Sequence, residues 1–457
     1  MTVSGKNSRI NIEKKVMFMA KKIIVAGGGH GGIACAMLLS KAGFDVTVYE
    51  KNSRENMGYD WTDIFNGKSF GDIGLALPPK EMILRSEEMS FLPPSERLIL
   101  RAEGNNFENS NIKMERKEIY NYIIPAAEEA GVKFVYETDI ICPVMAGDRV
   151  IGIKTDKGDF LGDLVIDACG CDSPVRANLP ECCGVQAETN AYEKFYVYRG
   201  FYNRGDAGEI RDKYKVYLMP KDVFGIAWVA DDKDYSDILI GELTPFSKEE
   251  ALEKTERFRK ENPVLGSELL RGGDMVTIPV RQTLAVMVAD GYAAIGDSAF
   301  MTVPIIGSGI ANAFRAAKIL ADTVIADKTQ TYSAETLWDY EYNYQTRIGF
   351  GLSSLALVKL LLTKLTTEQL DYLFESKIIT IKELQVSDEP GASPIDINSE
   401  LLGKASALIK NKKLLSLILG LGKDMALLAG INKTLPKYYS RRSVQAWAKR
   451  YEAVFRH

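Results

Sequence analysis

Five glycines and one histidine occupy positions 27–32 and directly follow a short apolar run, Ile23-Ile24-Val25. Gly27, Gly29 and Gly32 have the spacing G-x-G-x-x-G. In this pattern the first glycine allows a tight turn, the second lets the backbone approach a pyrophosphate, and the third lets a helix pack closely on a strand. We therefore predict a β-α-β unit with strands at residues 22–26 and 45–49 and a helix at residues 33–42.

A carboxylate at the end of the second strand supports this interpretation. Glu50 stands 18 residues after Gly32, where it can accept hydrogen bonds from ribose hydroxyls. The free N–H groups at the start of the helix favour phosphate. His30, inside the loop, is expected to face solvent. The cofactor contacts expected from this unit are Gly27, Gly29, Gly31, Gly32 and Glu50.

The apolar periodicity changes along the chain. Residues 57–105 read as irregular, residues 192–243 alternate with a period of two, and almost everything after residue 333 reads as helix. The predicted fold class is α/β, with a Rossmann-type domain interleaved with an antiparallel β domain and followed by a C-terminal helical region. The expected boundaries are 1–19 for a disordered extension, 20–175 and 277–330 for the cofactor domain, 176–276 for the β domain, and 331–457 for the helices.

Composition excludes several classes of protein. Hydrophobic residues make up 46% of the 457 residues, enough to bury a large core, and the net charge of −4 gives no reason to expect a nucleic-acid partner. The six cysteines lack the spaced pairs of a metal site. Two histidines are too few for a His-rich metal site or a Ser-His-Asp hydrolase. We therefore expect no metal, and reduced intracellular thiols.

The C-terminal residues 401–457 are strongly basic. They contain twelve Lys and Arg residues against Asp424 and Glu452, a net charge of +10, so that the rest of the chain carries −14 of the total −4. The longest uncharged apolar runs, 348–358 and 414–422, are shorter than a membrane span requires. We expect a cytoplasmic protein. Its tail either lies on a membrane surface or packs on the acidic remainder of the chain.

A second glycine motif follows about 250 residues after the first. The stretch Ala294-Ile-Gly-Asp-Ser-Ala299 continues through Pro304 and Gly307-Ser-Gly309 into a predicted helix. It resembles the distal flavin motif of the p-hydroxybenzoate-hydroxylase-like superfamily. The resemblance implies FAD as the cofactor, with Asp297 on the ribityl chain and Gly307, Gly309 and Ile310 beside the flavin pyrimidine edge.

Between the two motifs, the stretch Asp167-Ala-Cys-Gly-Cys-Asp-Ser-Pro-Val-Arg176 carries Cys169-Gly170 where aromatic hydroxylases have Asp-Gly. This form resembles the geranylgeranyl reductase family within that superfamily. The resemblance implies that Arg116 contacts the flavin diphosphate and that the backbone of Ile140 contacts adenine. The family's Tyr-x-Trp-x-Phe motif is represented only by Trp228, since Ile226 and Ala230 replace its aromatic residues.

The resemblance implies a flavin-dependent reductase that transfers hydride to a carbon–carbon double bond of an isoprenoid or other lipid-like substrate. The electron donor would be NAD(P)H or a redox protein. An aromatic monooxygenase and a non-catalytic flavin carrier or sensor remain alternatives. The expected walls of an apolar substrate site are Trp61, Trp228, Phe300 and Pro304.

Overall fold

The computed structural model describes residues 21–85, 87–101, 111–232, 234–384 and 408–456. The extension expected at residues 1–19 lies outside these ranges.

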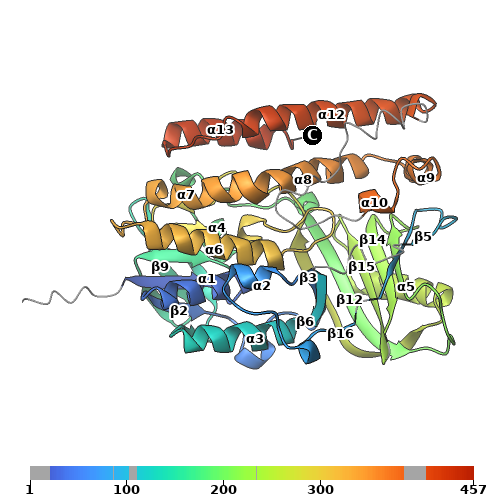
Figure 1. The fold of residues 1–457 in the computed structure, drawn as a ribbon, viewed down its shortest axis with the longest axis horizontal. Helices are drawn as coiled ribbons and strands as arrows, with labels where there is room; N and C mark the ends of the chain where they lie inside the picture. Colours follow the sequence, from blue (N-terminus) through green and yellow to red (C-terminus); the bar gives the residue numbers. More distant parts are fainter. Residues whose placement is uncertain (1–20, 86, 102–110, 233, 385–407, 457) are drawn as a thin grey trace, which may run out of the picture.

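Five parallel strands and one antiparallel edge strand form the sheet that carries the glycine loop (Figure 1). Residues 23–26 of the central strand β1 are fully buried, because helix α1 (His30–Lys41) packs on β1 and β2 while strand β9 (Arg149–Thr155) contacts β1 and β11. The order is β17-β18-β11-β1-β2-β7. The strands are β1 (Lys22–Ala26), β2 (Asp45–Tyr49), β7 (Lys133–Val135), β11 (Leu164–Asp167), β17 (Val288–Ala289) and β18 (Tyr292–Ala294).

Three helices lie beside this sheet and contact one another. The contacts of α1 with α6 and α3 bring the first and last parts of the cofactor region together. The strands predicted at 22–26 and 45–49 are confirmed, and the first helix begins at residue 30 rather than 33. These helices are α1 (His30–Lys41), α3 (Arg116–Glu129) and α6 (Ile310–Ala326). A three-stranded sheet adds β8 (Ile140–Ala146), β9 (Arg149–Thr155) and β10 (Gly158–Leu161).

A seven-stranded, mostly antiparallel sheet forms the other half of the molecule. The period-two pattern predicted its central strands, and the order is β16-β12-β15-β14-β13-β4-β5. Helix α5 (Lys248–Glu261) packs on β15 and β16. The strands are β4 (Met89–Leu92), β5 (Leu100–Arg101), β12 (Lys194–Arg204), β13 (Tyr214–Leu218), β14 (Gly225–Asp231), β15 (Tyr235–Glu242) and β16 (Leu265–Pro279).

The prediction that residues 57–105 are irregular was wrong in part. Strands β4 and β5 of this segment join the large sheet, and β3 (Thr62–Asn66) pairs with β6 (Asn111–Glu115). Their partners lie far away in the sequence, since β4 pairs with β13. Short strands whose pairing is non-local leave little periodicity for a sequence pattern to detect. The ribbon formed by β3 and β6 carries residues of the site described below.

The described residues after 333 are mostly helical, as predicted. In Figure 1, α12 and α13 lie side by side with α7 and α8 as an outer layer. The helices are α7 (Ala334–Tyr344), α8 (Phe350–Leu362), α9 (Thr367–Glu375), α10 (Ile381–Leu384), α12 (Lys412–Asn432) and α13 (Arg441–Ala453), with a π-helical turn at Gln345–Gly349.

One helix in the described part of the chain, α12, is long and apolar enough to cross a membrane by length and composition alone. Its best window has a mean hydropathy of 1.8, and 17% of that window is buried. The bent pair Ala334–Leu362 and Thr367–Glu375 meets the same criterion only when taken together. The sequence interpretation had excluded a span because it counted only uncharged runs, which end at Lys423 inside α12.

Candidate cofactor and substrate site

A cavity of about 450 Å³ lies between the glycine loop and one face of the seven-stranded sheet. The loop at residues 28–32 and Glu50 line one end of it. Its middle is lined by Arg116, Trp61 and Asp297, and its other end by apolar side chains of the sheet, such as Val216. The two halves of the molecule therefore share one continuous space.

Tight packing explains the glycines of the first motif. Gly27 has a φ of +89°, and a Cβ there would lie 2.6 Å from the carbonyl oxygen of Ala168, so a larger residue would displace backbone. A Cβ on Gly31 would lie 3.1 Å from the Cβ of Ala313, on α6. Gly27 lies behind the loop, whereas Gly29, Gly31 and Gly32 line the cavity.

Glu50 stands where the sequence predicted it, at the end of β2 and on the cavity wall. The backbone N–H of Gly28 donates to its Oε2 over 2.7 Å, and the N–H of Asn52 donates to its Oε1 over 2.9 Å. These two backbone groups orient the side chain. Because each carboxylate oxygen has a second lone pair, Glu50 can still accept a hydrogen bond from a ligand hydroxyl.

His30 does not face solvent, contrary to expectation. Its ring stacks on Tyr120 with centroids 4.4 Å apart and an interplanar angle of 18°. Burial, with a smaller effect from the Arg116 charge, lowers the pKa of His30 to about 3, so the ring is neutral at physiological pH. A sequence pattern could not place Tyr120, whose helix lies about 90 residues further along the chain.

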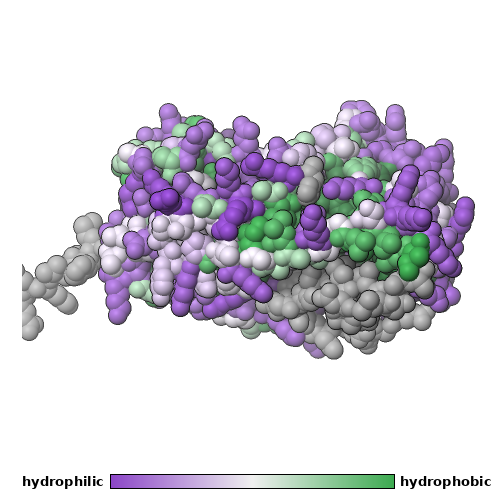
Figure 2. All heavy atoms as spheres, turned by 90° about the horizontal axis from the view of Figure 1, so that it is seen from above, coloured by the Kyte–Doolittle hydropathy of each residue, from purple (hydrophilic) through white to green (hydrophobic). Residues whose placement is uncertain are grey.

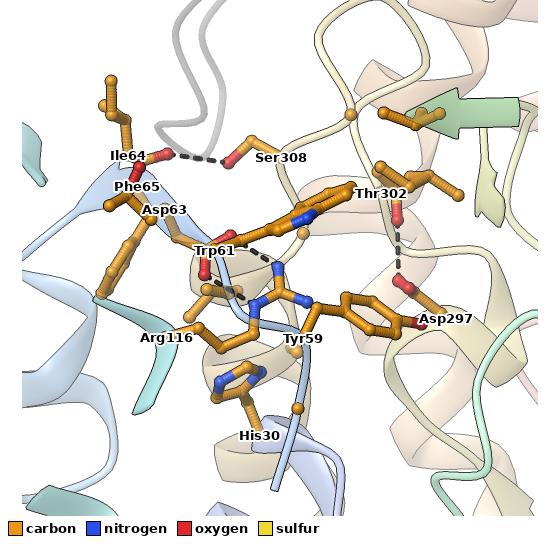
Figure 3. A pocket seen from close by; sticks show the side chains of 18 of the residues that line it. His30, Tyr59, Trp61, Asp63, Ile64, Phe65, Arg116, Asp297, Thr302 and Ser308 are labelled. Atoms are coloured by element: carbon orange, nitrogen blue, oxygen red, sulfur yellow. Dashed lines mark hydrogen bonds and ion pairs between the residues drawn. The ribbon is translucent and has the colours of Figure 1, made fainter. Parts of the chain in front are cut away.

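Arg116 is the first residue of α3 and lies in the centre of the cavity. Its guanidinium makes two hydrogen bonds to Asp63, of 2.6 and 2.7 Å, and lies over the rings of Tyr59 and Trp61 at 4.9 and 5.6 Å. Figure 3 shows this guanidinium between His30 and Trp61. Burial alone would raise the pKa of Asp63, but the Arg116 charge and hydrogen bonds hold it below its ordinary value.

The second glycine motif also reaches the cavity. Asp297 lies in a short 3-10 turn, and its Oδ1 accepts a 2.7 Å hydrogen bond from Thr302. Burial raises the pKa of Asp297 above its ordinary value. Helix α6 begins at Ile310, and Gly307, Gly309 and Ile310 line the cavity, so the N-terminus of a 17-residue helix lies at its wall.

The middle motif ties these parts together through one buried carboxylate. Asp167 accepts hydrogen bonds from Ser173, Tyr292 and Ser298 over 2.6, 2.8 and 3.0 Å. Ser298 belongs to the turn that carries Asp297, so Asp167 joins the middle and distal motifs. Cys169 donates to the carbonyl of Ala26, and burial raises the pKa of its thiol well above the ordinary value, which does not favour a reactive thiolate.

Four residues expected in the site do not line the cavity, namely Gly27, Ile140, Phe300 and Pro304. Phe300 is fully buried between the guanidinium groups of Arg176 and Arg281, 4.5 and 4.6 Å from its ring centroid. Pro304 is buried, and Ile140 is partly buried at the start of β8. Phe300 and Pro304 are part of the distal motif in the sequence, but the direction of their side chains depends on the fold.

Trp61 and Trp228 do line the cavity, and their rings lie 5.8 and 5.3 Å from the guanidinium of a charged pair that sequence reasoning missed. Arg199 and Asp237 form an ion pair of 2.8 Å within the sheet face and are almost completely buried. A charged residue on the inward phase of an alternating strand was the signal that could have found them.

Comparisons with known proteins agree with this geometry. Residues 25–65 match the family model described as an NAD(P)-binding Rossmann-like domain. A digeranylgeranylglycerophospholipid reductase of Sulfolobus acidocaldarius is 22% identical over 85% of this chain and 89% of its own. The digeranylgeranylglycerophospholipid reductase 2 of Methanococcoides burtonii is 26% identical over 88% of this chain and 96% of its own.

Solved structures show the same fold. A geranylgeranyl bacteriochlorophyll reductase-like protein from Thermoplasma acidophilum has a TM-score of 0.69 at 18% identity, covering 88% of this chain and 99% of that one. A probable FAD-dependent monooxygenase from Pseudomonas aeruginosa has a TM-score of 0.57 at 21% identity, covering 78% of this chain and 100% of that one. The predicted fold class is confirmed, and so is the resemblance of this chain to the geranylgeranyl reductase family.

Proposed function

We propose that this chain is an FAD-dependent oxidoreductase that reduces a carbon–carbon double bond of an isoprenoid or similar lipid. The observation that carries the proposal is the single cavity joining two glycine motifs to an apolar sheet face. The curated relatives named above are reductases of digeranylgeranylglycerophospholipids, which supports a lipid substrate.

The residues of the cavity fit FAD. The loop at 28–32 and the start of α1 offer backbone N–H groups to a diphosphate, and Glu50 offers carboxylate oxygens to a ribose. Asp297 would hold the ribityl chain. A Cβ on Gly309 would meet Oγ1 of Thr302 at 3.1 Å, so the glycine lets the N-terminus of α6 lie close to Thr302 and Asp297 on the cavity wall. Bound there, FAD would supply the hydride for the double bond.

The sheet side of the cavity fits a hydrocarbon. Its walls include Phe91, Val216, Ile226 and Leu239, and they exclude water from the space next to the cofactor motifs. Electrons would reach the cofactor from NAD(P)H or from a redox protein, the donors expected from the sequence.

An aromatic monooxygenase is the second candidate, since a probable FAD-dependent monooxygenase shares this fold. The named relatives favour reduction over hydroxylation. Anaerobic reduction of the purified yellow protein, followed by polyprenyl lipids or by air, separates the candidates. We expect the lipid to be saturated without oxygen. A stoichiometric hydroxylated aromatic product would overturn the proposal, and reversible reduction with no product would favour a carrier.

We also propose that the protein is cytoplasmic and that it associates peripherally with anionic membranes through its C-terminal helices. The inner side of α12 is buried at Leu414, Leu421 and Leu428, whereas Leu419 and Leu427 are 64% and 52% exposed. Figure 2 views the molecule from the side of α12 and α13 and shows hydrophobic residues gathered between hydrophilic ones. Basic residues around an exposed apolar surface favour an anionic lipid surface.

A further inference from the structure

The seven-stranded sheet presents one face to the cavity, and alternation along its strands makes that face apolar almost throughout. Arg199 and Asp237 are the exceptions: among the cavity-lining residues of this sheet that the structure describes, only these two are charged. Arg199 lies opposite Leu239 on the neighbouring strand, and Trp228 lies opposite Leu239 on its other side. The ion pair and the indole therefore share one side of the sheet.

These three side chains form a connected unit. The guanidinium of Arg199 donates to Oδ2 of Asp237 over 2.8 Å, and Nε1 of Trp228 donates to Oδ1 of the same carboxylate over 2.7 Å. The guanidinium also lies 5.3 Å from the centroid of the Trp228 ring, and the ring of Tyr214 meets that indole edge-on at 5.9 Å. The indole is thus held by its nitrogen, by one face and by an edge.

Arg199 also reaches across the cavity to the cofactor side. It donates to the carbonyl oxygen and to Oγ1 of Thr62, over 2.7 and 2.6 Å. Thr62 stands next to Asp63, the partner of Arg116. The ion pair therefore fixes the distance between the sheet wall and the strand that carries the cofactor-side arginine.

Stability does not explain this arrangement. Replacing a buried ion pair with apolar residues of similar size is often neutral or stabilising, so stability does not by itself account for a pair at this place. The Asp237 carboxylate uses both oxygens, one to hold an arginine and the other to hold an indole, on the cavity wall.

We propose that Asp237 is a specificity-determining positioning residue, which holds the Trp228 indole as a fixed wall of the substrate cavity. This inference rests on the proposed lipid reduction and deepens it. A rigid wall sets how long and how branched a hydrocarbon the cavity admits beside the cofactor motifs. If the wall moves, the affinities of the cavity for hydrocarbons of different length and branching become more similar.

Two variants test this. Asp237→Asn removes the charge that holds Arg199, and Trp228→Phe removes the Nε1–H while leaving the ion pair intact. In each we expect the ratio of kcat/KM for geranylgeraniol over geraniol to move toward one by about tenfold, mainly through KM. Asp231→Asn is the matched control, because Asp231 on β14 forms an ion pair with Arg204 on β12, in the same sheet, and neither residue lines the cavity.

A readout without turnover separates the inference from the proposed function. The chain has four tryptophans, so the near-ultraviolet circular dichroism of wild type minus Trp228→Phe isolates the signal of Trp228. We expect Asp237→Asn to lose that signal and Asp231→Asn to keep it. The wild type could bind geranylgeraniol selectively without turning it over, and Asp237→Asn could lose that selectivity. This outcome would support the role of Asp237 and overturn the proposed reduction of the double bond.

Unchanged selectivity in both variants, with turnover intact, would overturn the role of Asp237. If Asp237→Asn does not fold, Trp228→Phe decides alone, because it leaves no buried charge unpaired.

Discussion

The two ends of the cavity are built in different ways. At the glycine-loop end, backbone N–H groups and the absence of side chains make the site: Gly27 and Gly31 contribute by what they lack. At the sheet end, large side chains make the site, and Arg199, Asp237 and Trp228 hold one another by charge and hydrogen bonds. We therefore expect added atoms to disrupt the glycine-loop end. We expect the sheet end to be disrupted when atoms are removed or a charge is lost.

The largest effect is expected from adding one methyl group at the loop. Gly27→Ala would place Cβ 2.6 Å from a backbone oxygen at a φ of +89°. We expect Gly27→Ala to weaken the free energy of FAD binding by about 3 kcal/mol or more, which is at least a hundredfold loss of affinity. Titration of the apoprotein with FAD measures it. Gly43→Ala is the control, since its φ is +92° and nothing lies within 4 Å of its Cβ. Equal FAD affinity in the two variants would contradict the role of close packing.

Glu341 is a buried carboxylate outside the cavity, and unlike Asp63 and Asp237 in the cavity it is held by a backbone N–H rather than by an arginine. Glu341 accepts a 2.9 Å hydrogen bond from the N–H of Met287, and burial raises its pKa to about 8. Its folded pKa lies above the unfolded value, so the free energy of unfolding falls as pH rises from about 4.5 to about 8. We expect Glu341→Gln to remove on the order of 3 kcal/mol of this pH dependence, measured by denaturant unfolding.

The exposed Glu335 lies on the same helix, and Glu335→Gln should leave that pH profile unchanged. A Glu341→Gln profile parallel to the wild type would show that the carboxyl is not protonated in the folded protein.

Removing one carboxylate at the cofactor end tests whether any side chain matters there. Asp297→Ala would delete hydrogen bonds to the ribityl chain, and we expect a tens-fold loss of FAD affinity, about 2 kcal/mol. Asp322→Ala, on the exposed side of the adjacent helix α6, should bind FAD as the wild type does. Unchanged FAD affinity in Asp297→Ala would mean that the Asp297 side chain does not hold the cofactor.

The smallest effect is expected at the outer helices, far from both ends of the cavity. Leu419→Glu combined with Leu427→Glu should lower binding to anionic vesicles by about tenfold, because it places charge on the exposed apolar side of α12. FAD content should not change. Leu270→Glu, at an exposed leucine of β16, is the control. Equal sedimentation with anionic and neutral vesicles would contradict membrane association.

The glycine-loop end of the cavity could be predicted from the sequence by itself, whereas the sheet end could not. The strands at 22–26 and 45–49, the glycine loop, Glu50 and Asp297 follow one another in short segments, and all but Gly27 line the cavity or lead into it. Backbone conformation and glycine spacing are local properties, so a linear pattern contains them.

Tertiary structure alone decided the rest. Trp228 meets Asp237 and Arg199 only because three strands pair in one register, and Arg116 meets Asp63 because a ribbon joins β3 to β6. It also turned Phe300 away from the cavity and His30 onto Tyr120. The direction of a side chain depends on packing against residues distant in the sequence, and a linear pattern does not record those contacts.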